Sequence, residues 1–367
     1  MMSGARLVAG FGLVLSLMLP VRAVAGPTLL FEPATGRVLY AEEMDDQWHP
    51  ASLTKMMTAY LTFQAIKAGK IKLDTPITYS EAAHKMPPSK IGLPVGATLQ
   101  VDIALQSVIV KSANDIALAL AEAVGGSEEA FVEQMNQTAR RLGMTRTVFR
   151  NPHGLHAPEQ VSTARDLARL AVAVVRDFPE HAHYWAQSQM QFGQIQITSH
   201  NGLFKTLPGA DGIKTGFICD SGYNMVASAT RDGVRLMAVV LGERTAAERN
   251  QRAAELLEHG YVTREWKALF GARQTVASLP LSPEAKDAAS IRNSIISIEC
   301  TNRRMARVAA AAKRAKARNA KAAAKRQPAQ QQGGAPGAPT PAAAAKAKAT
   351  ATARTAAPAS AAAPAAK

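Results

Sequence analysis

Apolar residues recur with the period of strands near both ends of residues 28–260 and with the period of helices between them. Two short apolar runs around the turn signal Glu32–Gly36 predict a hairpin over residues 28–40. Strands are also predicted over residues 194–197, 212–217, 223–229 and 234–241, the last two joined by an Asp-Gly turn at Asp232-Gly233.

Helical spacing predicts a helix from Ser52 to about Lys67, closed by Gly69. Further helices are predicted over residues 101–124, with a polar interruption at 111–115, and over 128–142, 163–175 and 246–259, the last ending at Gly260. Residues 70–98 are rich in Pro and Gly, so we expect an irregular excursion there. The simplest architecture is an α+β fold in which an antiparallel sheet from both chain ends packs against helices.

The first of these helices begins with a hydroxyl and an amine three residues apart, Ser52 and Lys55, directly after Pro50. Side chains at this spacing share a helix face, so the Lys55 amine can reach the Ser52 proton. Free backbone N–H groups and the helix dipole at this end favour negative charge on an attacking serine. A lysine with the ordinary pKa of about 10.4 is a poor base at pH 7, so a catalytic site needs burial or a second cation beside Lys55.

Two other polar segments interrupt apolar elements and supply groups of that kind. Ser112 and Asn114 offer a hydroxyl that can pass a proton and an amide that both donates and accepts. Lys214, Thr215 and Gly216 fall on a predicted strand, where Lys214 is the candidate second cation and Gly216 lets a ligand approach the backbone. Each segment alone is also compatible with an ordinary helix cap or a solvated strand edge.

The formal charge of +15 comes from the C-terminal segment. Residues 301–367 contain 14 Lys and Arg and no Asp or Glu, which leaves 29 basic and 28 acidic residues in the rest of the chain. The body is therefore nearly neutral, and we expect no nucleic-acid partner. The Ala/Lys/Pro-rich tail has few residues able to form a core, so we expect a disordered cationic tether that touches an anionic wall or membrane surface.

The N-terminal segment has the features of an export signal. Arg6 precedes an apolar run over residues 7–19, and Ala23-Val24-Ala25 is a small-residue cleavage site. The run is short for a membrane span, although an uncleaved anchor is the alternative. We therefore expect an exported protein on the periplasmic or cell-wall side, peripheral to the membrane if its tail binds there.

These features divide the chain into four parts. We expect a signal peptide at residues 1–25, one catalytic domain at 26–272, an extension at 273–300 and the low-complexity tail at 301–367. Cys219 and Cys300 would meet an oxidising compartment. They could pair, and so attach the extension to the domain, or remain two buried thiols.

Taken in order, Ser52-x-x-Lys55, Ser112-x-Asn114 and Lys214-Thr215-Gly216 resemble the three motifs of the penicillin-binding proteins and serine β-lactamases. The separations of 60 and 102 residues suit a single domain of that superfamily. Residues 50–56, the Asn-Pro-His-Gly-Leu loop at 151–155 and residues 211–216 resemble the low-molecular-mass D-alanyl-D-alanine carboxypeptidases. This resemblance extends from about Thr28 to Tyr261.

The resemblance implies acyl transfer in two halves. Ser52, deprotonated by neutral Lys55, would attack the penultimate D-Ala carbonyl of a peptidoglycan stem pentapeptide, and water would then cleave the acyl-enzyme. Ser112 would relay the proton to the departing amine, while Asn114 would bond the substrate amide and orient Lys55. β-Lactam antibiotics are the expected covalent inhibitors, and the mechanism needs no metal or cofactor.

The third motif would bind the end of the substrate. Lys214 and Thr215 would hold the terminal carboxylate, with Gly216 beside them, which gives selectivity for a free C-terminus. The backbone N–H groups of Ser52 and Phe217 would bind the oxyanion.

Several alternatives remain open at this point. A class A-like β-lactamase would carry a Glu that directs water, but no Glu-x-x-x-Asn lies between Asn114 and Lys214. A D,D-endopeptidase would use the same motifs. A zinc D,D-peptidase would need His153 with His156 or His181 with His183 as ligands, but the chain has no His-Glu-x-x-His. A cationic wall-binding protein would depend on the tail alone.

Overall fold

The computed structural model describes residues 26–269, 274–295, 300, 313–314 and 317–318. The expected signal peptide and nearly all of the expected basic tail lie outside these residues, and the expected boundary at 272 falls in an undescribed gap. The elements discussed below belong to the compact unit that ends at Val308.

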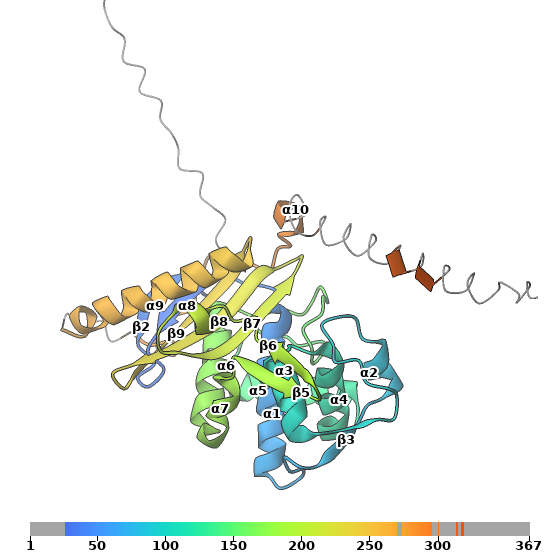
Figure 1. Ribbon diagram of the computed structural model, residues 1–367. Coiled ribbons are helices and arrows are strands. Elements are labelled where there is room, and N and C mark those ends of the chain that lie inside the picture. Colours follow the sequence, from blue (N-terminus) through green and yellow to red (C-terminus); the bar gives the residue numbers. More distant parts are fainter. Residues whose placement is uncertain (1–25, 270–273, 296–299, 301–312, 315–316, 319–367) are drawn as a thin grey trace, which may run out of the picture. The chain divides into compact units, whose positions relative to one another are not determined.

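The centre of the fold is a five-stranded antiparallel sheet with the order β2-β1-β9-β8-β7 (Figure 1). Its strands are β1 (Thr28–Phe31), β2 (Val38–Glu42), β7 (Ala210–Ile218), β8 (Gly222–Arg231) and β9 (Val234–Glu243). The N-terminal hairpin therefore adds to the C-terminal meander through the β1–β9 pair. The α+β architecture expected from the sequence is confirmed.

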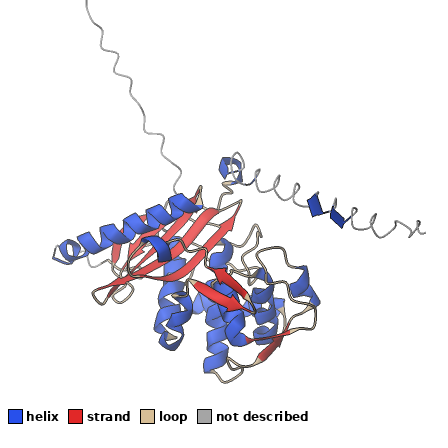
Figure 2. Ribbon diagram, viewed as in Figure 1, coloured by secondary structure: helices blue, strands red, loops and turns tan. Residues whose placement is uncertain are grey.

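Alternate residues of the strands form two separate cores, one on each face of the sheet. Leu30 and Val240 belong to the core beneath α9 (Ala246–Leu269), whereas Leu29 and Val239 belong to the core shared with the other large helices. Figure 2 shows α9 along one face of the sheet and most of the remaining helices on the other. These helices are α1 (Lys55–Lys67), α3 (Val101–Ile109), α4 (Asn114–Gly125), α5 (Glu128–Arg141) and α6 (Ala164–Arg176).

Helix α1 is the central helix of this second layer. Ten of its 13 residues are buried, on all sides of the helix. It contacts α3, α4, α5 and α6. A helix that is buried on every side must pack against other elements all around it. The N-terminal end of α1 is therefore held in place at one edge of the sheet.

The first turn before α1 differs from the sequence expectation. Ser52 lies in a 3-10 turn, η1 (Ala51–Thr54), and the α-helix begins only at Lys55. Side chains three residues apart are eclipsed in a 3-10 turn. The change therefore brings the Ser52 hydroxyl and the Lys55 amine closer together than a regular α-helix would.

The closing helix is longer than expected, because the prediction that Gly260 ends it was wrong. Helix α9 continues through Gly260 to Leu269. A Cβ at position 260 would lie 2.8 Å from Leu236 Cδ1 and 3.0 Å from Leu30 Cδ2. Gly260 thus allows the helix to pack closely on the sheet and does not mark its C-terminus.

The expected irregular excursion also contains regular structure. Residues 70–100 include β3 (Pro76–Thr78), α2 (Glu81–Lys85) and β4 (Thr98–Gln100). The buried carboxylate of Asp115 accepts hydrogen bonds from the backbone of Ile91 and Gly92 and from Tyr79, so a residue of α4 holds this region in place.

The remaining short elements follow α6. They are η2 (Pro179–His181), α7 (Ala182–Trp185), β5 (Gln189–Phe192), β6 (Ile195–Thr198) and α8 (Leu203–Thr206). The predicted strand at 194–197 is therefore one arm of a small hairpin.

After α9 the chain returns along the domain in a segment that we call the strap, residues 274–295 with Cys300. Its first residues bond to the end of the N-terminal hairpin, where Val38 N donates to Gln274 O. Buried Arg165 then binds Asp45 and donates to the carbonyls of Val276, Leu279 and Pro280. The strap ends with a short helix, α10 (Arg292–Ile295), and with the Cys219–Cys300 disulfide. No helix among the described residues combines the length and the apolar character needed to cross a membrane.

Candidate active site

The Ser52 hydroxyl and the Lys55 amine are in direct contact. Lys55 Nζ lies 3.0 Å from Ser52 Oγ. The amine also donates to Asn114 Oδ1 at 2.8 Å and to the carbonyl of His153 at 2.5 Å. The protein groups that hold Lys55 are thus neutral oxygen acceptors, and none of them is a carboxylate.

These surroundings disfavour the charged form of Lys55. The side chain is fully buried, and burial holds the pKa of Lys55 well below its ordinary value. The nearby Lys214 ammonium lowers this pKa further, while the Asp115 carboxylate acts in the opposite direction. The structure therefore supplies both conditions that the sequence required of a lysine base, burial and a neighbouring cation.

The second and third motifs meet above this pair. Lys214 Nζ donates to Ser112 Oγ at 3.0 Å and to the Thr215 carbonyl at 3.1 Å. Burial, reinforced by the charge of Arg249, lowers the pKa of Lys214 to about 7. Ser112 has a φ of +60°, a strained conformation for a residue with a side chain, and it lies in the break between α3 and α4.

Two glycines allow Ser52 to lie between β7 and the loop over Asn151–His156. A Cβ on Gly216 of β7 would lie 3.0 Å from both Pro50 O and Ser52 N. A Cβ on Gly154, whose φ is +81°, would lie only 1.9 Å from Ala51 O. Both positions therefore exclude a side chain, and β7 and the loop can lie against η1 from two sides.

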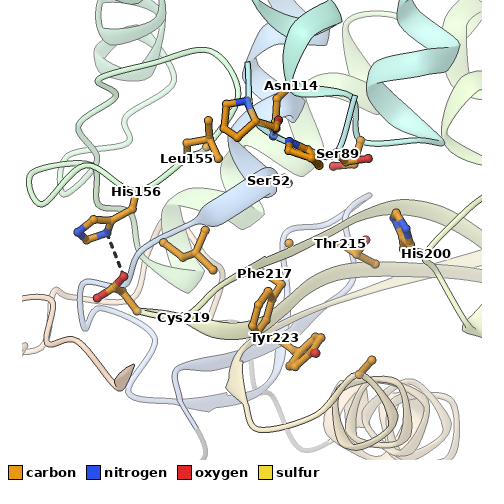
Figure 3. Close-up of a pocket in the computed structure, with 18 of the residues that line it drawn as sticks. Ser52, Ser89, Asn114, Leu155, His156, His200, Thr215, Phe217, Cys219 and Tyr223 are labelled. Carbon is orange, nitrogen blue, oxygen red and sulfur yellow. Dashed lines mark hydrogen bonds and ion pairs between the residues drawn. The ribbon is translucent and has the colours of Figure 1, made fainter. Parts of the chain in front are cut away.

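Ser52 and Ser112 line a cleft of about 1370 Å³, and the amines of Lys55 and Lys214 contact their hydroxyls from beneath. In Figure 3, Ser89, Asn114 and Leu155 lie on one side of it, while Thr215, Phe217 and Tyr223 lie on the other. Because β7 is the last strand of the sheet, the edge opposite β8 faces this cleft. Lys90, Lys111, Arg249 and Arg292 also line it, whereas Asp220 is the one carboxylate among the described lining residues.

The structure thus brings together every residue that the sequence proposed for catalysis or substrate binding: Ser52, Lys55, Ser112, Asn114, Lys214, Thr215, Gly216 and Phe217. The sequence also raised Cys219 and Cys300 as a pair, and the structure joins them with a Cα–Cα distance of 6.0 Å. Both cysteines line the cleft.

Sequence reasoning missed Arg249, an almost completely buried cation of α9 that lines the cleft. Arg249 Nη2 donates to the His200 carbonyl at 3.1 Å, and the guanidinium lies over the Tyr223 ring. Burial lowers the pKa of Arg249 to about 10, against the effect of Tyr223. One signal in the sequence could have indicated that Arg249 is buried. It lies four residues before Ala253 and eleven before Gly260, spacings that place all three on the apolar face of the helix.

The histidines considered as zinc ligands have separate surroundings. Burial, aided by Lys55, lowers the pKa of His153 to about 3, and its Nδ1 accepts from Leu155 N. His156 instead lies 3.3 Å from Asp220. Over the described residues, no three His, Cys, Asp or Glu side chains gather in a way that could hold a metal ion.

Comparison with known proteins agrees with this arrangement. The family model for D-alanyl-D-alanine carboxypeptidase, Peptidase_S11, matches residues 19–245. The chain is 40% identical over 240 residues to D-alanyl-D-alanine carboxypeptidase DacC of Escherichia coli, a match that covers 64% of this chain and 60% of the relative. DacA of Haemophilus influenzae is 38% identical over 252 residues, covering 67% and 64%. The chain therefore matches somewhat less than two thirds of the length of these relatives.

Solved structures show the same fold. Penicillin binding protein 5 from Haemophilus influenzae superposes with a TM-score of 0.63 at 37% identity, covering 65% of this chain and 71% of that one. Penicillin-Binding Protein D2 from Listeria monocytogenes, in its cefotaxime-bound form, gives a TM-score of 0.60 at 29% identity and covers 65% and 97%. With the family model matching more than half of its residues, the chain belongs to the D-alanyl-D-alanine carboxypeptidase family of S11 peptidases.

Proposed function

We propose that this protein is a serine-type D-alanyl-D-alanine carboxypeptidase that removes the terminal D-Ala from peptidoglycan stem pentapeptides. The observation that carries the proposal is the buried Lys55 amine, which contacts the Ser52 hydroxyl and has no carboxylate partner. Because burial holds its pKa well below the ordinary value, such a lysine can give up its proton more readily than a solvated one and act as a general base.

In the first half-reaction Ser52 attacks the carbonyl carbon of the penultimate D-Ala. The serine proton passes to neutral Lys55, and the backbone N–H groups of Ser52 and Phe217 stabilise the oxyanion. The C–N bond then breaks, and Ser112 relays the proton that Lys55 took from Ser52 to the amine of the departing D-Ala. Asn114 orients Lys55 through the 2.8 Å contact and bonds the substrate amide. Water attacks the resulting ester in the second half-reaction and regenerates Ser52.

The terminal carboxylate of the substrate binds at the other motif. Lys214 and Thr215 would hold it, and the buried cation of Arg249, which lines the cleft with Thr215, would add to the attraction. Each of these groups favours a substrate with a free C-terminus. The same carboxylate recognition explains why penicillins, which carry an acid beside the reactive amide, are expected to acylate Ser52.

The lining of the cleft favours this activity over a class A-like β-lactamase. Asp220 is the lining carboxylate in the described part of the chain, and it is paired with Arg292 and so is poorly suited to activate water. Glu128 lies behind His153, 3.7 Å from its imidazole. Slow hydrolysis of the acyl-enzyme from a penicillin is therefore expected.

A labelled penicillin tests the proposal. We expect a covalent adduct on the peptide that contains Ser52, located by mass spectrometry, and none in Ser52→Ala. Release of D-Ala from a synthetic pentapeptide should be lost in the same variant. Circular dichroism of Ser52→Ala should match the unmodified protein. An adduct elsewhere, or D-Ala release that survives Ser52→Ala, would contradict the assignment.

The apolar segment at residues 7–19 and the disulfide support a proposal that the protein acts outside the cytoplasm. The 14 basic residues of 301–367 are proposed to contact anionic wall or membrane surfaces. Cell fractionation at low and high salt tests both points. Removal of residues 301–367 should abolish salt-sensitive retention and leave penicillin acylation unchanged.

A further inference from the structure

The end of the cleft beyond Phe217 is built partly by the strap. Arg292 and Cys300 line the cleft there, together with Asp220 and His156. The strap follows residues 19–245, which the family model matches. The strap residues of this wall, Arg292 and Cys300, therefore lie outside the matched range, whereas Asp220 and His156 lie inside it.

Asp220 organises the polar groups of this wall. Arg292 donates from Nε to Asp220 Oδ1 at 3.1 Å and from Nη2 to Oδ2 at 2.6 Å. Ser290 Oγ donates to the same carboxylate, and the Ile291 N–H donates to the Asp220 carbonyl. His156 approaches from the opposite loop at 3.3 Å (Figure 3). The strap is thus attached at this point through four hydrogen bonds and, at Cys300, through the disulfide.

Arg292 keeps donors available for a ligand. A guanidinium has five N–H groups, and Asp220 uses one on Nε and one on Nη2. The Arg292 side chain is 49% exposed, whereas that of Asp220 is 7% exposed. The carboxylate therefore fixes the guanidinium in place from the protein side, and the exposed part of Arg292 lines the cleft.

The distance from Thr215 to this wall of the cleft can be compared with the length of a bound peptide. A strand rises about 3.3 Å per residue, so the stretch from Thr215 to Cys219 spans about 13 Å. Counted back from a terminal carboxylate held at Thr215, about 13 Å of extended peptide reaches the second residue of five, which then lies beside Cys219. The second cationic end of the cleft thus lies beside the second residue of a bound pentapeptide.

We propose that Arg292, fixed by Asp220 on the disulfide-attached strap, binds a carboxylate on the second residue of the stem pentapeptide. This inference rests on the proposed function and adds a substrate preference to it: stems with a free acid there are better substrates than stems with a carboxamide. Lys214 and Arg249 bind the terminal carboxylate, and Arg292 binds the upstream one.

Matched synthetic pentapeptides test the preference in the full-length mature protein. One pair differs only in a free acid or a carboxamide on the third residue, and a second pair differs in the same way on the second residue. In the pair that differs on the second residue, kcat/KM should be about fivefold higher for the acid, the size expected for a charge pair that remains half exposed to water, whereas the pair that differs on the third residue should show no such preference. Arg292→Gln should reduce that ratio to about one by slowing only the acid, and Arg292→Lys should retain part of it.

Lys90→Gln is the matched control, because it removes one positive charge from a residue that lines the same cleft and donates to His84 O. It should leave the acid-to-amide ratio unchanged. Three outcomes would each overturn the proposal: an acid-to-amide ratio of one in the second-residue pair for the unmodified enzyme, an equal loss of kcat/KM for acid and amide in Arg292→Gln, or the same change in Lys90→Gln. Labelled penicillin still reacting at Ser52 would show that the proposed function survives such a result, whereas its absence would mean that the proposed function itself fails.

Discussion

At the floor of the cleft, Lys55 and Lys214 are buried and are held by neutral oxygen acceptors, whereas at the rim Arg292 is half exposed and is held by a carboxylate. Burial without a negative partner lowers the pKa of both lysines. The ion pair at the rim has the opposite consequence, because hydrogen bonds from Arg292 and Ser290 lower the pKa of Asp220 to about 2 and keep both partners charged.

The difference separates two tasks within one cleft. Groups whose protons are loosely held can take part in proton transfer, so the floor suits acylation chemistry. Groups that stay charged at every pH near neutrality can only attract and orient, so the rim suits recognition. Variants at the floor should therefore change the acylation rate strongly, and variants at the rim should change it little.

The largest effect on acylation is expected from Lys55→Met. The substitution keeps the length of the side chain and removes the base, so the second-order rate of acylation by labelled penicillin should fall by about 10³-fold. Lys67→Met, at the exposed end of the same helix, is the matched control and should acylate normally. A Lys55→Met rate above a tenth of the unmodified rate would remove Lys55 from the proposed role.

The next largest effect is expected from Gly154→Ala. The new Cβ would collide with Ala51 O, next to Ser52. The free energy of unfolding should fall by about 3 kcal/mol or more, and acylation should slow by about a hundredfold because Ser52 is displaced. Gly233→Ala is the comparison, since it has a similar φ of +75° with nothing within 4 Å of its Cβ. It should cost only about 1 kcal/mol and leave acylation unchanged. If Gly154→Ala and Gly233→Ala lost equal amounts of unfolding free energy and of acylation rate, close packing against η1 would be unimportant.

The pH dependence of the acylation rate should reflect the titration of both Lys55 and Lys214. The rate should rise with pH as Lys55 loses its proton, and it should fall above about pH 7, where Lys214 loses the charge that attracts the carboxylate of penicillin. In Lys214→Arg the cation persists, so the falling limb should move to higher pH by one unit or more, at a lower maximum rate. Stopped-flow or quenched acylation across this range measures both limbs. If the fall in acylation rate occurs at the same pH in Lys214→Arg, it is caused by the titration of another group.

The smallest effect on acylation is expected from Cys300→Ser. The disulfide closes a sequence separation of 81 residues, so its loss should lower the free energy of unfolding by about 2 to 4 kcal/mol. Limited proteolysis within residues 274–295 should become faster, while acylation changes by less than about twofold. A tenfold loss of acylation would show that the floor depends on the strap, and the division between floor and rim would then be wrong.

Local features of the fold could be predicted from the sequence because short-range interactions decide them. The Asp232-Gly233 turn occurs as expected, with both residues at positive φ. The break between α3 and α4 lies where polar residues interrupt the apolar period. Thr163 caps α6 by accepting from Asp166 N, close to the predicted helix start. The ordered set of motifs also identified the floor of the site, since each motif is a short stretch of chain.

Features that depend on distant packing could not be predicted. Gly260 looks like a helix terminator in the sequence, but it lies in the middle of α9 because Leu30 and Leu236 require close approach. Arg249 looks like one of several charged residues in a surface helix until the sheet buries it beside the cleft. The path of the strap depends on Arg165, Asp45 and Asp220, which lie far from it in sequence.

The sequence by itself determined the α+β class, the family and the residues that meet at the floor of the cleft, because strand and helix periods and short motifs are properties of neighbouring residues. Only the tertiary structure decided that Lys55 is a buried amine with neutral partners, and that Arg292 faces the same cleft as a charged group. A pKa and a substrate preference depend on which distant groups surround a side chain and how much water they exclude, and the order of residues alone does not specify either.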